Sequence, residues 1–255
     1  MQMPVNRFKR ALAERRLQIG LWSQLCSPIA AEVLAGAGLD WVVIDTEHAP
    51  NELPAVADQL RALDGGSASP VVRVAWNDMV LVKRLLDIGA QTLLFPFVQS
   101  AEDARQAVAY TRYPPLGVRG VAGTHRANRY GRVKDYHRHA HAEICVLVQV
   151  ESRQAVDRIA AIAAVEGIDG VFIGPADLAA SLGHLGELGH PEVSQAIATG
   201  HRACEAAGKP IGILAAVEAD ARRFIDMGFT FVAVGSDLGL LAAHSSAIAA
   251  SFKPE

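Results

Sequence analysis

The sequence predicts a (β/α)8 (TIM) barrel, and the alternation of two kinds of segment carries that prediction. Short apolar segments recur along the 255 residues, and a stretch with helical periodicity follows most of them. Eight such segments in about 250 residues match the usual length of this barrel. A doubly wound sheet is the main alternative, but it needs a glycine-rich turn after its first strand. Trp22-Ser23-Gln24-Leu25 offers no such turn, so the barrel is favoured.

The expected strands are rich in Val, Ile and Leu and lack polar alternation, which is typical of strands buried on both faces. They span residues 18–22, 41–45, 70–75, 92–97, 144–150, 170–174, 210–214 and 230–235. The expected helices span residues 28–36, 53–63, 79–88, 101–110, 154–165, 191–207 and 217–227, several of them closed by glycine. Because no linker or repeat interrupts this order, we expect a single domain over residues 1–255.

Composition narrows the class of protein. The chain is 51% hydrophobic and 20% charged, which is enough for a large core. Its net charge of -3 argues against a nucleic-acid partner, since such partners usually require a basic face. Three widely spaced cysteines indicate a reducing compartment rather than a disulfide framework. No secretory signal and no apolar run of about 18 residues is present, so we expect a cytoplasmic protein without a membrane span.

Two acidic residues follow neighbouring expected strands. Glu151 ends the run CVLVQV, and Asp177 follows the run GVFI through the turn Gly174-Pro175-Ala176. Active sites of these barrels lie at the carboxyl ends of the strands, where the two acids would converge. A pair of carboxylates completed by water and substrate suits Mg or Mn. The alternative is that each acid caps the helix after it. The Gly174 turn could also direct backbone N–H groups at an anion.

Three further strand ends carry polar groups. The segment 45–48 holds Asp45, Glu47 and His48, and we expect His48 to be a general base whose ring Asp45 orients. A surface-loop histidine is the alternative. Arg73 lies within an apolar strand, which favours a guanidinium directed at a carboxylate or an oxyanion over a purely structural ion pair. Gly235-Ser236-Asp237 ends the last strand, where a helix cap is favoured over an anion site.

The positions of the lysines limit the chemistry. The lysines are Lys9, Lys83, Lys134, Lys209 and Lys253, and none of them ends an expected strand. A Schiff-base mechanism needs a lysine at the reacting centre, so the sequence favours metal-assisted chemistry.

The long segment 111–143 has no clean periodicity, and loops of this length are usually functional or form interfaces. Its histidines 137, 139 and 141 are better explained as a solvated polar stretch than as a metal site.

Taken together, these motifs resemble the class II pyruvate aldolases of the HpcH/HpaI family, and the likeness covers nearly the whole chain. The matching segments are DTEHAPN, PVVRV, YPP-GVRGV, VQVES, VEGIDGVFIGPADLA and FVAVGSDLGLL. Within the family, THRANRYGRV, LGHLGELGHPEV and GKPIGILAAVEADARR most resemble the branch that acts on 2-dehydro-3-deoxyglucarate. Thr46 departs from that branch, which carries Gly there, and matches the 4-hydroxy-2-oxoheptanedioate branch.

The resemblance implies roles for these residues. Glu151 and Asp177 would hold Mg, Mn or Co, which a 2-oxo acid chelates. Arg73 would stabilise the pyruvate enolate, and His48 with Asp45 would act on the C4 hydroxyl. The residues that would line the pocket are Trp22, Glu47, Gln149, Gly174, Pro175, Ala176 and Leu214. The resemblance also implies a homohexamer, a trimer of dimers, whose last helix is swapped between subunits.

The implied reaction is reversible retro-aldol cleavage of a 4-hydroxy-2-oxo acid to pyruvate and an aldehyde. For the glucarate branch the aldehyde is tartronate semialdehyde, and for the heptanedioate branch it is succinate semialdehyde. A lyase acting on a CoA ester is disfavoured because no basic tract for CoA is present. A barrel that binds a metal and an oxo acid without catalysis is the alternative from another class, and the intact set of His48, Arg73, Glu151 and Asp177 weighs against it.

Overall fold

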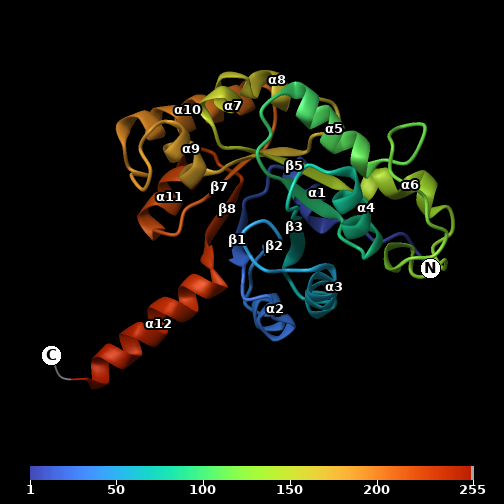
Figure 1. Cartoon of the computed structure of the whole chain (residues 1–255), viewed down its shortest axis with the longest axis horizontal. Coiled ribbons are helices and arrows are strands. Elements are labelled where there is room, and N and C mark those ends of the chain that lie inside the picture. Colours follow the sequence, from blue (N-terminus) through green and yellow to red (C-terminus); the bar gives the residue numbers. More distant parts are fainter. Residues whose placement is uncertain (254–255) are drawn as a thin grey trace.

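The computed structural model describes residues 1–253 and shows a closed barrel of eight parallel strands in chain order, as predicted (Figure 1). Each strand pairs with the next, and β1 closes the ring against β8. The strands are β1 (Gln18–Ser23), β2 (Trp41–Asp45), β3 (Ser69–Arg73), β4 (Thr92–Phe95), β5 (Cys145–Val150), β6 (Gly170–Ile173), β7 (Ile211–Leu214) and β8 (Phe231–Ser236). All eight agree with the expected strands to within two residues at each end.

Helices surround the barrel. They are α1 (Arg7–Ala13), α2 (Pro28–Ala35), α3 (Leu53–Ala62), α4 (Met79–Asp87), α5 (Ala101–Thr111), α6 (Tyr136–Glu143), α7 (Arg153–Asp157), α8 (Ile159–Ala163), α9 (Pro175–Ser181), α10 (Pro191–Ala206), α11 (Glu218–Asp226) and α12 (Asp237–Phe252), with a 3-10 turn η1 (Arg126–Asn128). The expected helix over residues 154–165 is two short helices in the structure, because the chain leaves helical geometry at Arg158.

Aromatic side chains fill the barrel interior. Trp41 lies among Trp22, Phe172 and Phe231, with ring centroids 6.0–6.5 Å apart. Phe8 of α1 approaches Trp41 from the amino-terminal end of the strands, at 5.6 Å. This filling closes the lower part of the barrel interior, and active sites of this fold lie at the carboxyl ends of the strands.

The segment 111–143 is ordered and contains η1 and α6. Arg119 anchors it, because this side chain is fully buried and donates to Asp87 Oδ1 at 2.7 Å. His137 lies on α6 with Nε2 3.0 Å from the carbonyl oxygen of Ala122. His137, His139 and His141 lie on helix α6, where His139 is exposed and the other two are half-buried.

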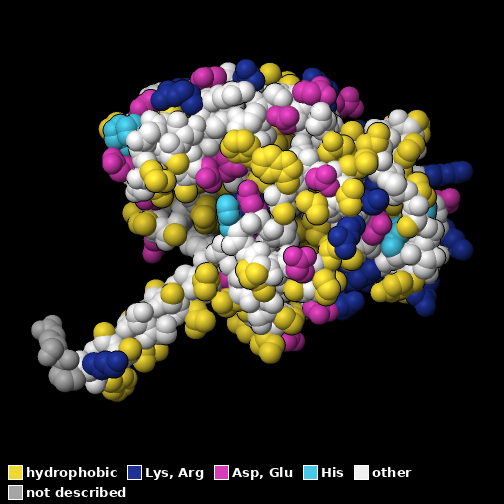
Figure 2. All heavy atoms as spheres, viewed as in Figure 1, with side chains coloured by type: hydrophobic (Ala, Val, Ile, Leu, Met, Phe, Trp, Pro, Cys, Tyr) yellow, Lys and Arg dark blue, Asp and Glu magenta, His cyan; other side chains and the backbone are white. Residues whose placement is uncertain are grey.

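Helix α12 runs away from the barrel (Figure 1). Its apolar side chains are largely exposed, and Figure 2 shows hydrophobic groups along its length. Leu241 is 57% exposed and Phe252 is 85% exposed. Large exposed apolar patches mark interaction surfaces. The swap of this helix onto a neighbouring subunit stays a prediction.

Within residues 1–253 no helix is both long enough and apolar enough to cross a bilayer. The cysteines Cys26, Cys145 and Cys204 are all free, as expected.

Candidate active site

Arg73 and Asp45 form the centre of the carboxyl-terminal rim. They end β3 and β2, and the parallel register places them opposite each other. Arg73 Nε donates to Asp45 Oδ1 at 2.9 Å, and Arg73 Nη2 donates to Asp45 Oδ2 at 2.7 Å. Both side chains are almost fully buried. Arg73 therefore forms an internal ion pair, which was the structural alternative, and its role toward a bound oxyanion stays a prediction.

Glu47 and Trp22 complete the surroundings of this guanidinium. Glu47 Oε2 lies 2.8 Å from Arg73 Nη1 as an ion pair, without the angle of a hydrogen bond. The Arg73 guanidinium carbon lies 5.3 Å from the centroid of the Trp22 ring. A guanidinium has five N–H groups, and these contacts leave part of that donor capacity for a ligand. The Arg73 guanidinium is therefore held in a fixed orientation, and some of its N–H groups remain free to bind a ligand.

The two acids beside Arg73 have pKa values displaced in opposite directions. Burial alone would raise the pKa of Asp45, but the hydrogen bonds and charge of Arg73 hold it below its usual value. Burial raises the pKa of Glu47, against the opposing charge of Arg73 and with the help of the Glu151 charge. Asp45 is therefore the acid that stays ionised to hold Arg73.

Glu151 follows β5 and is buried. Its Oε1 accepts the backbone N–H of Phe97 at 2.7 Å, and its Oε2 accepts the side-chain amide of Gln149. Burial raises the pKa of Glu151, and the nearby charge of Asp177 raises it further. Ser152, not Glu151, caps helix α7, since its hydroxyl accepts the N–H of Ala155. The helix-capping alternative for Glu151 is therefore wrong.

Asp177 lies in the first turn of α9, directly after β6. Gly174 is the N-cap of this helix, and no side chain makes the capping hydrogen bond. Asp177 is exposed, and it follows β6, the strand that pairs with β5 before Glu151, so the two acids lie at neighbouring strand ends. A side chain at position 174 would overlap the Glu151 carboxylate, which explains the glycine of this turn.

The residues present fit a divalent cation. Asp45, Glu47, Glu151 and Asp177 supply four carboxylates against the single guanidinium of Arg73. Gln149 Oε1 is buried and accepts no hydrogen bond from any described residue, so an oxygen donor remains free beside Glu151. Hard divalent cations prefer oxygen ligands, and a bound cation would remove the repulsion that raises the Glu151 pKa.

The pairing expected between His48 and Asp45 differs in the structure. Asp45 Oδ1 accepts the backbone N–H of His48 at 3.3 Å, whereas the His48 Nε2 atom lies 3.9 Å from Glu47 Oε2. Arg73 occupies both oxygens of Asp45, so this carboxylate shapes the loop and Glu47 is the acid nearest the ring. The His48 side chain is 60% exposed at the rim.

The other predicted pocket residues lie on or directly after β1, β5, β6 and β7. Trp22 is buried under Arg73, and Leu214, at the end of β7, is partly exposed. Pro175 and Ala176 open α9 beside Asp177. The Thr46 hydroxyl donates to the carbonyl oxygen of Arg73 at 2.6 Å.

Sequence reasoning missed Phe97 and Gln24. Phe97 follows β4 and has a left-handed φ of 52°, which turns its N–H toward Glu151. Its ring stacks on Trp76 at 5.9 Å, and both rings are about half exposed beside the site. Gln24 Nε2 donates to Asp45 Oδ2 at 3.2 Å. Gln24 directly follows β1 and Phe97 lies two residues after β4, so nearness to a strand end was the available signal.

The lysines lie away from this rim. Lys9 and Lys209 are at the amino-terminal end of the barrel, where Lys209 Nζ donates to the carbonyl oxygen of Ile168 at 2.6 Å. Lys83 is on α4, Lys134 precedes α6 and Lys253 follows α12. The expectation that no lysine ends a strand is confirmed.

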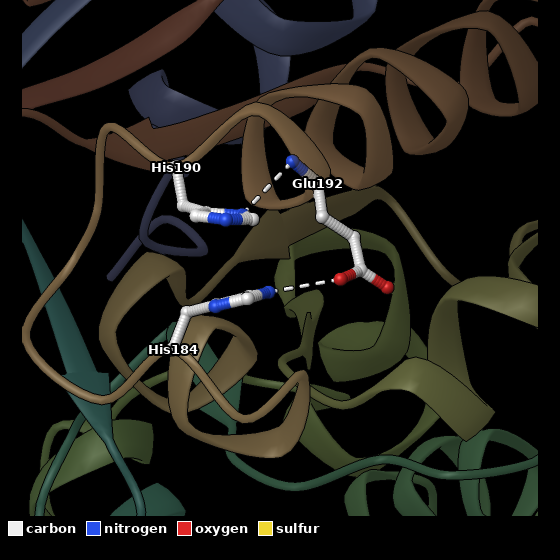
Figure 3. A group of neighbouring side chains, drawn as sticks. All are labelled: His184, His190 and Glu192. Carbon is white, nitrogen blue, oxygen red and sulfur yellow. Dashed lines mark hydrogen bonds and ion pairs between the residues drawn. The ribbon is translucent and has the colours of Figure 1, made fainter.

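A second cluster lies beyond α9 (Figure 3). Within residues 1–253, His184, His190 and Glu192 are the only group of three or more His, Cys, Asp or Glu residues with ligating atoms within 4.8 Å of one another. The two imidazole rings stack at 3.4 Å with an interplanar angle of 18°, so their in-plane lone pairs cannot meet at one ion. Glu192 already accepts from Arg153 and contacts His184 at 2.8 Å. As arranged, the cluster is a helix cap and an ion pair.

Comparison with known proteins shows the family of the chain. The family model of the HpcH/HpaI aldolase/citrate lyase family matches residues 18–244. A 5-keto-4-deoxy-D-glucarate aldolase of Escherichia coli O6:H1 (strain CFT073) is 55% identical over 248 residues, 97% of each chain.

Two crystal structures give the same result. An HpcH/HpaI aldolase/citrate lyase family protein from Burkholderia cenocepacia J2315 matches with a TM-score of 0.94 and 45% identity, covering 98% of this chain and 100% of that chain. The HpcH/HpaI aldolase from Desulfitobacterium hafniense DCB-2 matches with a TM-score of 0.89 and 30% identity, covering 97% of this chain and 96% of that chain. The fold and these matches define an enzyme of the aldolase and lyase class. The chain belongs to the HpcH/HpaI aldolase/citrate lyase family.

Proposed function

We propose that the protein cleaves a 4-hydroxy-2-oxo diacid of the 2-dehydro-3-deoxyglucarate type to pyruvate and tartronate semialdehyde, using a divalent cation. The observation that carries the proposal is the position of Glu151 directly after β5 and of Asp177 in the first turn after the neighbouring β6, on the rim where Arg73 ends β3. The name of the Escherichia coli relative supports the substrate class. A 5-keto-4-deoxy hexaric acid, numbered from its other end, is a 2-oxo-3-deoxy acid with a hydroxyl at C4.

Glu151 and Asp177 would hold the cation, which can be Mg, Mn or Co. A cation bound there supplies electrostatic stabilisation to the oxygens of the 2-oxo acid. The remaining donor capacity of Arg73 would face the same ketone oxygen, where negative charge develops as the C3–C4 bond breaks. Preoriented donors at such a position typically contribute several kcal/mol in a site that excludes water.

His48 would remove the C4 hydroxyl proton, directly or through a water molecule. As that proton leaves, the C4 oxygen becomes the carbonyl of the aldehyde and the electrons of the C3–C4 bond pass into the enolate of pyruvate. A proton returned to C3 completes the cleavage. Glu47, 3.9 Å from the ring, would stabilise the imidazolium that forms and so support the base role of His48.

The exposed apolar face of α12 supports the hexamer and the swapped helix. A second copy of this chain is the proposed occupant, because α12 is continuous with β8 and, among the described residues, buries only Asp237 within its own chain. Mass measurement by size-exclusion chromatography with light scattering tests this assignment. Removal of residues 238–255 should lower the assembly state. A monomeric full-length chain at micromolar concentration would contradict the proposed assembly.

Pyruvate release from 2-dehydro-3-deoxyglucarate tests the activity. Turnover should require Mg or Mn, stop with EDTA and return when the metal is restored. Glu151→Gln and Asp177→Asn should each remove it, whereas Glu205→Gln on the exposed face of α10 should not. Chelator-insensitive turnover would overturn the metal assignment. Absence of turnover on this substrate, with turnover on 4-hydroxy-2-oxoheptanedioate, would move the protein to the branch that Thr46 matches.

A further inference from the structure

A buried chain of polar side chains connects the first residue of α12 with Asp45. Its members are Ser23, Asn51, Gln59 and Asp237, which are 0%, 6%, 0% and 7% exposed. Among the described residues, no arginine or lysine forms an ion pair with Asp237. A buried carboxylate without a cationic partner is costly and is retained only where hydrogen bonds satisfy it.

The first route runs through the turn after β1. Asp237 Oδ1 accepts the backbone N–H of Gln24 at 2.8 Å, and Asp237 Oδ2 accepts that of Leu25 at 3.3 Å and the Ser23 hydroxyl at 3.1 Å. This carboxylate therefore fixes the backbone of residues 23–25. The Gln24 side chain, placed by that backbone, then donates to Asp45 Oδ2 at 3.2 Å.

The second route reaches the backbone of Asp45. The Ser23 hydroxyl lies 3.3 Å from Gln59 Oε1, and Gln59 Nε2 donates to Asn51 Oδ1 at 2.7 Å. Asn51 Nδ2 donates to the carbonyl oxygen of Asp45, also at 2.7 Å. The Ser23 hydroxyl has one proton for two acceptors, so the link from Asp237 to the main chain of Asp45 passes through a shared donor, whereas the link to the Asp45 carboxylate passes through Gln24.

Asp237 also fixes the start of α12, since its Oδ1 accepts the N–H of Leu238 at 2.7 Å. Ser236, as predicted for this strand end, is the N-cap of the helix and accepts the N–H of Gly239 at 3.0 Å. The same carboxylate therefore holds the point where α12 leaves the barrel and the turn that supports Asp45. A change in the direction of α12 can therefore reach the turn that supports Asp45 through this residue.

We propose that Asp237 is a positioning residue. It couples the point where α12 leaves the barrel to the positions of the Asp45 and Arg73 side chains. The inference rests on the proposed aldolase function. Asp237 acts through Gln24 and Ser23 and does not itself contact Arg73. Its loss should therefore disturb stabilisation of the transition state more than binding of the substrate, because small displacements of a catalytic group can cost about 100-fold in rate.

The test is steady-state kinetics of Asp237→Asn, Gln24→Leu and the double variant, with Asp220→Asn as the matched control. Asp220 is a half-exposed acid on α11, paired with Arg223. We expect kcat to fall at least about tenfold in Asp237→Asn, with KM changed less than about twofold. The double variant should lose less than the product of the two single losses, since both act on Asp45.

Three results separate the possibilities. If the wild-type protein shows no turnover, the proposed function is wrong. Active wild-type protein with an unchanged kcat in Asp237→Asn, or with independent effects of the two substitutions, overturns the positioning role. If Asp237→Asn does not fold, the test rests on Gln24→Leu. The proposal requires this variant to have a lower kcat and an unchanged circular dichroism spectrum, and an unchanged kcat would overturn it.

Discussion

Gly174 and Glu151 lie so close that a single added carbon atom at position 174 would overlap the Glu151 carboxylate. The glycine opens α9 and the acid follows β5, so the turn between β6 and α9 presses against the proposed metal ligand. The end of β6 can therefore lie this close to the Glu151 carboxylate because residue 174 has no side chain.

The first prediction concerns that contact. Gly174→Ala should weaken Mn binding by about tenfold or more, because Glu151 must move from its place beside Gln149 and Phe97. Isothermal titration with Mn measures the effect. Gly189→Ala is the control, since a side chain there meets no atom within 4 Å. Equal Mn affinity in both variants would contradict the role of the contact.

The second prediction concerns pH. Burial and the charge of Asp177 raise the pKa of Glu151, and a metal binds only the ionised carboxylate. Mn affinity should therefore fall as the pH is lowered through that raised value, at a higher pH than for an ordinary glutamate. Titrations between about pH 7 and about pH 5 measure it. Affinity that stays constant down to the usual glutamate pKa of 4.5 would show that Glu151 is not a ligand.

The third prediction is a gain of stability with a loss of activity. A carboxyl group whose pKa is raised by folding destabilises the folded state at a pH above that value, where it is ionised. Glu151→Gln should therefore raise the melting temperature of the metal-free protein at neutral pH while it abolishes turnover. Each kcal/mol corresponds to roughly 2–4 °C for a chain of this size. The difference should shrink as the pH falls below the raised pKa.

Thermal unfolding in EDTA, followed by circular dichroism, measures this difference. Glu205→Gln, on the outer face of α10, is the matched control. A Glu151→Gln variant that unfolds at a lower temperature than the wild type at neutral pH would show that the hydrogen bonds of this carboxylate outweigh its desolvation.

The fourth prediction concerns Arg73. Arg73→Lys cannot reproduce the two-point contact with Asp45 and should lower kcat about 100-fold or more, as loss of a preoriented donor does. Arg73→Ala should also cost about 3–5 kcal/mol of stability, because Asp45 is left buried without its cation. Arg222→Lys, at an exposed ion pair on α11, is the control. Near-normal turnover of Arg73→Lys would remove the guanidinium from the mechanism.

Most of the barrel could be predicted because its strands are buried on both faces and bounded by turn residues. Helices α1, α6, α9 and α12 were not among the expected helices. Helix α12 has apolar residues around most of its surface and, among the described residues, buries only Asp237, so no single apolar face marked it. Helix α6 is rich in histidine and buries only Tyr136 and Ala140.

The site shows the same division between what spacing can and cannot predict. Glu151, Asp177 and Arg73 could be located because each follows or ends a buried strand. The partner of His48 could not be, because a spacing of three residues fits a backbone contact to Asp45 as well as a side-chain one. The contact of Phe97 with Glu151 depends on a left-handed backbone at a residue that rarely adopts it, which no sequence pattern signals.

The distribution of the three tryptophans has a consequence for spectroscopy. Trp22 and Trp41 are enclosed in the barrel, whereas Trp76 is 54% exposed on the rim beside Phe97. Intrinsic fluorescence therefore combines an emission from enclosed indoles with one from a hydrated indole that a soluble quencher reaches first. Because Trp22 lies directly beneath Arg73, the enclosed emission reports optically on what the guanidinium binds, without any added label.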